Sequence, residues 1–107
     1  MQRLGMTIRL KPGCAEVYKA YHRAVLPEVL EQLTACNIRN YSIYLKADVL
    51  FGYFEYIGND LKADLARMAA HSPTQQWWAI IEPLQNPLID RKKGEWWSEM
   101  EEVFHLD

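Results

Sequence analysis

The sequence predicts an α+β fold in which helices cover one face of an antiparallel sheet. Apolar residues recur with a period of two near the amino terminus and again in the middle of the chain, which is typical of strands. Between and after these segments they recur at helical spacing. The resulting order is strand, helix, strand, strand, helix, strand. This order is the split β-α-β motif of ferredoxin-like folds.

The first strand and the first helical segment are the clearest of these patterns. Apolar side chains occupy every second position over residues 4–10, and the proline and glycine of residues 11–13 end the strand. A helical segment is predicted over residues 14–36, where one stripe contains Val17, Tyr21, Val25, Val29 and Leu33. Pro27 interrupts this stripe because it donates no backbone hydrogen bond, so we expect a kink or a break there.

The middle of the chain predicts a β-hairpin. Residues 40–45 and 49–56 are rich in aromatic and β-branched side chains, and a short connection joins them. Aromatic side chains fall on both faces of this hairpin, namely Tyr44, Phe51, Tyr53, Phe54 and Tyr56. Because helices cover only one face, the other needs a second cover. We expect a homodimer packed through the sheets, or a cleft lined by the open face.

Two more helices and a final strand complete the predicted elements. Asn59-Asp60 is expected to cap a helix whose inward residues are Leu61, Leu65 and Met68. Ser72-Pro73 is typical of an N-cap followed by proline in the first turn, and predicts a further helix through Glu82. Alternation over residues 100–106 predicts a strand-like carboxyl end, and residues 86–98 form the irregular stretch.

Composition bounds the class of protein and its partners. The chain, predicted to be one domain over residues 1–107, is half apolar and has a net charge of −2. With no apolar run near the ~18 residues of a membrane helix and no basic run beyond Arg91-Lys92-Lys93, we expect neither a membrane nor a nucleic-acid partner. Cys14 and Cys36 lie at opposite ends of the predicted helical segment, too far apart for a disulfide, which predicts a reduced, cytoplasmic protein. Metal-ligand spacings and a glycine-rich phosphate loop are lacking, so we expect no metal and no cofactor.

Two residues of the first helical segment suit acid–base chemistry. Tyr18 and His22 are four positions apart and therefore neighbours on one helix face. The ordinary pKa of histidine lies nearest neutrality, so its imidazole can give or take a proton. A phenol one turn away can orient that ring or bind a hydroxyl. The alternative is that both side chains lie at the rim of the core, held by ordinary hydrogen bonds.

Aromatic residues from other segments suit the walls of a sugar site. Tyr41 begins the second strand, and Trp77 and Trp78 are adjacent on a helix. Adjacent helical side chains point about 100° apart, so one tryptophan can fill the core while the other edges a pocket. Flat rings cover the C–H faces of a sugar, and their polar groups bind hydroxyls. Core packing is the alternative for this pair, and Trp96-Trp97 repeats the pattern in the irregular stretch.

Five motifs taken together resemble the L-rhamnose mutarotase family. In order they are Tyr18-x-x-x-His22, Leu26-Pro27-Glu28, Asn40-Tyr41-Ser42-Ile43-Tyr44-Leu45, Gln76-Trp77-Trp78 and Glu102-Val103-Phe104. The resemblance covers nearly the whole chain. It implies a dimeric ferredoxin-like α+β barrel that interconverts the α and β anomers of L-rhamnose. Leu26, where the family often has tryptophan, and residues 83–98 depart from the pattern.

By the same resemblance His22 is the proton donor, and Tyr18, Tyr41, Trp77 and Trp78 contact the sugar. Opening a hemiacetal needs a proton delivered to the ring oxygen and one taken from the anomeric hydroxyl, and closing is the reverse. Acid–base assistance with such transfers typically gives about 10²–10⁴-fold. Two other functions stay open. One is a non-catalytic deoxy-sugar-binding module, and the other is a cofactor-free monooxygenase on the same dimeric barrel. The sequence does not distinguish rhamnose from fucose, lyxose or mannose as the preferred sugar.

Overall fold

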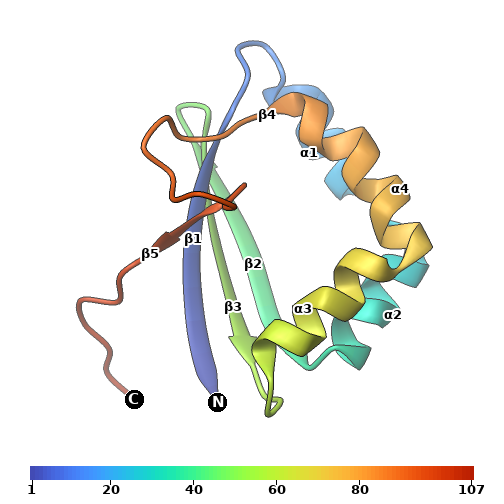
Figure 1. The fold of residues 1–107 in the computed structure, drawn as a ribbon. Coiled ribbons are helices and arrows are strands. Elements are labelled where there is room, and N and C mark those ends of the chain that lie inside the picture. The colour runs from blue at the N-terminus through green and yellow to red at the C-terminus, as the bar shows by residue number, and fades with distance from the viewer.

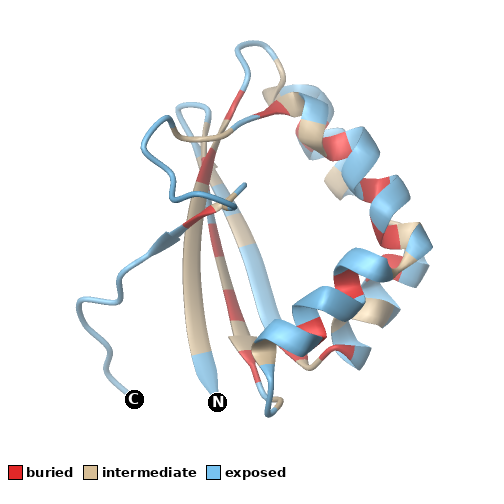
Figure 2. Cartoon of the chain, in the orientation of Figure 1, coloured by how far each residue is buried: buried red, intermediate tan, exposed pale blue.

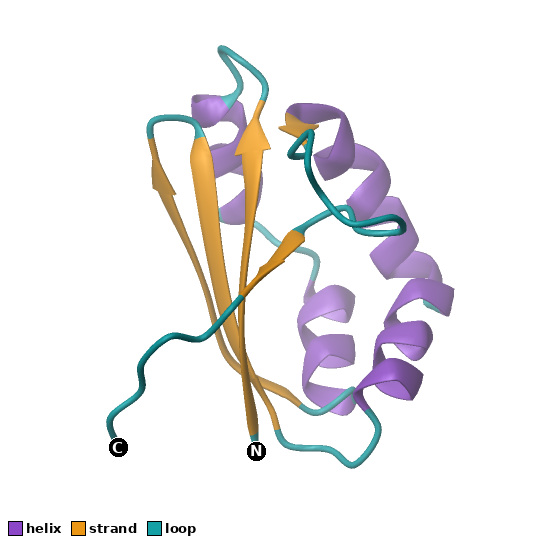
Figure 3. Cartoon of the chain, turned by 60° about the vertical axis from the view of Figure 1, so that its left-hand side comes forward, coloured by secondary structure: helices purple, strands orange, loops and turns teal.

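An antiparallel sheet forms one layer and four α-helices the other in a computed structural model that describes residues 1–107 (Figure 1). The elements are β1 (Gln2–Leu10), α1 (Ala15–His22), α2 (Pro27–Ala35), β2 (Ile38–Lys46), β3 (Val49–Tyr56), α3 (Leu61–Ala70), α4 (Ser72–Ile81), a short 3₁₀ helix (Glu82–Leu84), β4 (Gln85–Asn86) and β5 (Ser98–Met100). The sheet order is β2-β3-β1-β4, and β5 also pairs with β1. All helices lie on one side of the sheet (Figure 3), which confirms the predicted fold class.

Pro27 begins a new helix instead of bending a longer one. It is the first residue of α2, where the missing N–H has no partner to lose, so the predicted break is confirmed. The break also turns α1 relative to α2. Tyr18 and Val29 are the buried residues of the two helices, whereas Val17 and Tyr21 of the predicted stripe are 41% and 40% exposed. The prediction that Val17 and Tyr21 face the core was wrong because it assumed one continuous helix.

The second pair of helices follows its predicted capping only in part. Asp60 caps α3, and its side chain accepts a hydrogen bond from the Ala63 N–H at 3.1 Å, as predicted. Met68 is buried, and Leu65, although 43% exposed, lines a cavity between the sheet and the helices, so both side chains face inward as predicted. The N-cap of α4 is His71 and not Ser72, which is the first helical residue of α4.

The carboxyl end is less regular than its alternation predicts. β5 pairs with Gly5–Thr7 of β1, and the chain then leaves the sheet, so the strand predicted over residues 100–106 ends at Met100. Residues 101–107 are exposed, as Figure 2 shows. Two hydrogen bonds of 3.1 Å from Arg3 to Glu102 hold this tail beside β1. Because this segment is not part of the sheet, its alternating apolar side chains have no buried face to pack against.

A bulge in β2 decides which of its side chains face the helices. The predicted hairpin forms from β2 and β3, but Asn40 and Tyr41 together stand opposite Phe54 alone. An extra residue inverts the alternation of faces beyond it. In a regular strand, residues five positions apart point to opposite faces. Because of the bulge, Ile38 before it and Ile43 after it both face the helices. Asn40 has a φ of 50°, in the left-handed region that asparagine tolerates.

The apolar core forms two clusters between the sheet and the helices. The larger contains Ile8, Leu10, Tyr18, Val29, Leu50, Trp77 and Ile81, and the smaller contains Ile38, Phe54 and Tyr56. The opposite sheet face has no helical cover, and there Tyr44 and Phe51 are 67% and 41% exposed. None of the helices has the length and apolar character needed to cross a membrane.

Candidate functional site

A cavity of about 830 Å³ lies between the sheet and the helices. Most of its lining is apolar, with a few polar groups among aromatic rings. All the side chains that the sequence predicts for a site line it, namely Tyr18, His22, Tyr41, Trp77 and Trp78. They reach it from α1, β2 and α4. Leu26 does not line the cavity but packs against the larger core cluster.

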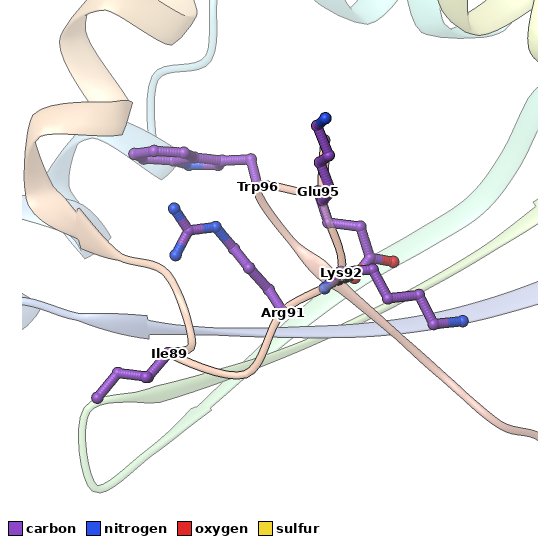
Figure 4. Close-up of a pocket in the computed structure, with 7 residues that line it drawn as sticks. Ile89, Arg91, Lys92, Glu95 and Trp96 are labelled. Atoms are coloured by element: carbon purple, nitrogen blue, oxygen red, sulfur yellow. Dashed lines mark hydrogen bonds between the residues drawn. The ribbon is translucent and has the colours of Figure 1, made fainter.

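A second hollow, of about 570 Å³, lies on the loop between β4 and β5 (Figure 4). Its lining includes Ile89, Trp96 and the basic run Arg91-Lys92-Lys93. Both lysines and the arginine are exposed, so this run is a solvated loop, as its composition indicates. None of the predicted site residues lines this hollow.

His22 is held at the cavity wall with one ring nitrogen free. Its ring stacks on Tyr18 with the centroids 4.2 Å apart, and the edge of Trp77 lies 5.2 Å away. Nδ1 lies 2.9 Å from the Tyr18 carbonyl oxygen. A carbonyl only accepts, so Nδ1 carries a hydrogen and Nε2 of the neutral ring is an acceptor. Burial lowers the pKa of His22, opposed in part by the Tyr18 carbonyl, so the ring is neutral near pH 7.

The two cavity tyrosines are protonated at physiological pH. Burial raises the pKa of Tyr18 to about 12, and a hydrogen bond from Gln85 partly offsets that rise. The pKa of Tyr41 is also raised to about 12, by burial around its hydroxyl, although the residue as a whole is 39% exposed. The β2 bulge turns Tyr41 toward the helices, and its ring packs 5.4 Å from that of Phe54. Both phenols therefore offer hydrogen-bond donors to the cavity.

The adjacent tryptophans of α4 have different surroundings. Trp77 is 8% exposed and belongs to the core, where it supports His22. Trp78 is 37% exposed and lines the rim of the same cavity. Trp77 therefore packs in the core while also lining the cavity, and Trp78 forms an edge of the pocket.

Gln85 is a site residue that sequence reasoning missed. It lies on β4 and is only 3% exposed. Its Nε2 is 3.3 Å from the Tyr18 hydroxyl, and its Oε1 accepts from the Trp96 indole N–H at 2.7 Å. Because 67 residues separate Gln85 from Tyr18, no spacing pattern indicates their contact. The second tryptophan pair was the only signal in this region, and both Trp96 and Trp97 line the cavity.

Comparison with known proteins gives the family of this chain. The sequence profile described as L-rhamnose mutarotase matches residues 3–106. This chain belongs to the L-rhamnose mutarotase family. An L-rhamnose mutarotase of Mannheimia succiniciproducens is 32% identical over 109 aligned residues, which cover 100% of both chains.

Solved structures similar to this member of the L-rhamnose mutarotase family share its fold. An L-rhamnose mutarotase from Formosa agariphila superposes with a TM-score of 0.78 at 21% identity, covering 100% of both chains. Tetracenomycin F2 cyclase from Streptomyces glaucescens superposes with a TM-score of 0.74 at 18% identity, covering 100% of this chain and 98% of the cyclase. At these identities the likeness concerns the fold, an antiparallel curled sheet with helices on one face.

Proposed function

We propose that this protein interconverts the α and β anomers of L-rhamnose, acting as an isomerase without a cofactor. Membership of the L-rhamnose mutarotase family is the observation that carries the proposal. The cavity supports it, because its volume of about 830 Å³ suits a monosaccharide and its aromatic walls suit the C–H faces of a sugar ring.

The reaction needs one proton acceptor and one proton donor. Ring opening removes a proton from the anomeric hydroxyl, breaks the bond between the anomeric carbon and the ring oxygen, and adds to that oxygen a proton supplied by a tyrosine or a water. Nε2 of neutral His22 is the acceptor. Rotation about the C1–C2 bond then presents the other face of the aldehyde. On closure the sugar hydroxyl attacks the aldehyde carbon and gives its proton back to the tyrosine or water, while the protonated imidazole delivers its proton to the aldehyde oxygen. This delivery is the donor role that the family resemblance implies for His22.

The aromatic residues divide the remaining tasks. Tyr18 and Tyr41, both protonated, donate hydrogen bonds to oxygen atoms of the sugar. Trp78 at the rim covers a face of the sugar ring, while Trp77 holds the His22 ring in place. Acid–base assistance of about 10²–10⁴-fold is sufficient for this reaction, because mutarotation already proceeds in water.

We further propose that the protein is a homodimer packed through the open sheet faces. Tyr44, Phe51 and Met100 lie on that face with 67%, 41% and 38% of their surface exposed. The exposed carboxyl tail adds Phe104, which is 79% exposed. Apolar surface of this kind is what a second copy would cover. Both cysteines are free thiols, which suits a reducing compartment, and we place the protein in the cytoplasm.

Saturation-transfer NMR on L-rhamnose at anomeric equilibrium tests the function. The native protein should speed exchange between the two anomeric protons, and the rates with fucose, lyxose and mannose then give the sugar preference. Saturable rhamnose binding without faster exchange would indicate the sugar-binding module. Oxygen uptake with a quinol substrate, again without faster exchange, would indicate the monooxygenase. Either result, or no effect on any sugar, would overturn the proposal.

A further inference from the structure

A buried amide joins two aromatic residues of the cavity wall, and its orientation is determined by chemistry. Gln85 lies between the Tyr18 hydroxyl and the Trp96 indole, at 3.3 Å and 2.7 Å. An indole N–H only donates, so it must face the amide oxygen. The amide nitrogen of Gln85 therefore faces Tyr18. The reverse orientation would place two N–H donors against each other.

This orientation determines where the Tyr18 hydrogen points. The Gln85 N–H donates, so the Tyr18 oxygen accepts, and an amide nitrogen has no lone pair to accept a hydrogen bond in return. No other group of the chain accepts a hydrogen bond from the Tyr18 hydroxyl. The hydroxyl hydrogen is left to the cavity, which Tyr18 also lines.

We propose that Gln85, held by Trp96, is a positioning residue that makes Tyr18 a hydrogen-bond donor toward the bound sugar. The inference rests on the proposed function and deepens it. One turn along α1, His22 presents an acceptor at Nε2. The cavity wall thus offers one hydrogen-bond donor, Tyr18, and one acceptor, His22. A hemiacetal centre offers the complementary acceptor and donor. Its ring oxygen only accepts, whereas its anomeric hydroxyl can donate. Tyr18 therefore meets the ring oxygen, and His22 meets the anomeric hydroxyl.

Gln85→Glu reverses this polarity with almost no change of shape. An ionised carboxylate accepts from both the Trp96 indole and the Tyr18 hydroxyl, so the Tyr18 hydrogen turns away from the sugar. We expect kcat/KM for rhamnose to fall by roughly 10- to 100-fold, the effect of one lost hydrogen bond. At lower pH the protonated carboxyl donates as the amide does. The ratio of variant to native activity should therefore decrease as pH rises.

Two controls separate positioning from simple packing. In a Tyr18→Phe background, Gln85→Glu should cause no further loss, because no hydroxyl remains to turn. Gln85→Met keeps the length but removes both polar groups, so its ratio to native activity should not depend on pH. A loss of equal size in the Tyr18→Phe background, or a pH-independent ratio for Gln85→Glu, would overturn the proposal.

A measurement without substrate keeps this inference distinct from the proposed function. With tyrosine labelled at ¹³Cζ, the Tyr18 resonance is the one that disappears in Tyr18→Phe. Gln85→Glu should move it toward the phenolate position, since the hydroxyl then donates to a carboxylate, whereas Gln85→Met provides no acceptor and should move it much less. A Tyr18 signal that neither variant moves would refute the role of Gln85. This result holds even if the native protein fails to exchange rhamnose anomers.

Discussion

Replacing His22 by phenylalanine removes the imidazole chemistry and leaves the packing nearly intact. The His22 ring stacks on Tyr18 at 4.2 Å and contacts Trp77 at 5.2 Å. Each such aromatic pair contributes about 0.5–1.5 kcal/mol to stability. His22→Ala would remove both contacts and so destabilise the protein as well as remove the imidazole. A phenyl ring keeps them and loses only the hydrogen bond from Nδ1 to the Tyr18 carbonyl. That bond contributes about 1 kcal/mol, so we expect Tm to fall by roughly 4–8 °C.

The expected loss of activity is much larger than this loss of stability. Without an acceptor for the anomeric proton, kcat should fall by about 10²–10⁴-fold, or about 2.7–5.5 kcal/mol of transition-state stabilisation. Saturation-transfer NMR of L-rhamnose at 25 °C measures the rate, and circular dichroism measures Tm. Tyr21→Phe is the matched control, because Tyr21 is on the same helix but 40% exposed, and it does not line the cavity. A folded His22→Phe variant with native exchange rates would show that the imidazole is not the base.

Three further predictions concern pH, the bulge and assembly. The pKa of His22 is lowered, so kcat/KM should stay constant above pH 6.5 and fall about tenfold per pH unit below the lowered pKa; an inflection on the alkaline side of 6.5 would contradict this. Asn40→Val puts a β-branched residue at a φ of 50°, which should lower the free energy of unfolding, measured in urea, by about 1–2 kcal/mol. It should also raise KM by displacing Tyr41, whereas Asn40→Gly should have a smaller effect on both quantities. Phe51→Glu should convert a dimer to a monomer in sedimentation experiments, while Ile80→Glu, at a helix residue that is 40% exposed, should not; two variants of equal mass would exclude assembly through the sheet.

The local parts of this fold were predictable because local rules determine them. Alternation over β1, the cap at Asp60 and the break at Pro27 each depend on hydrogen bonds or steric limits within a few residues. The pairing of Tyr18 with His22 is of the same kind, since a helix brings residues four apart together. The alternation of residues 100–106 failed as a prediction because a strand also needs a neighbour, and the chain leaves β1 after Met100.

The sequence by itself determined the order of the elements from β1 to α4, the helix face that pairs a phenol with an imidazole, and the motifs of the family. Only the tertiary structure decided that Tyr41 faces the helices, through one extra residue in β2, and that Gln85 contacts Tyr18. Secondary structure follows from forces that act over a few residues. The contents of a cavity depend on how distant segments pack, and a single inserted residue reverses which face a strand presents to it.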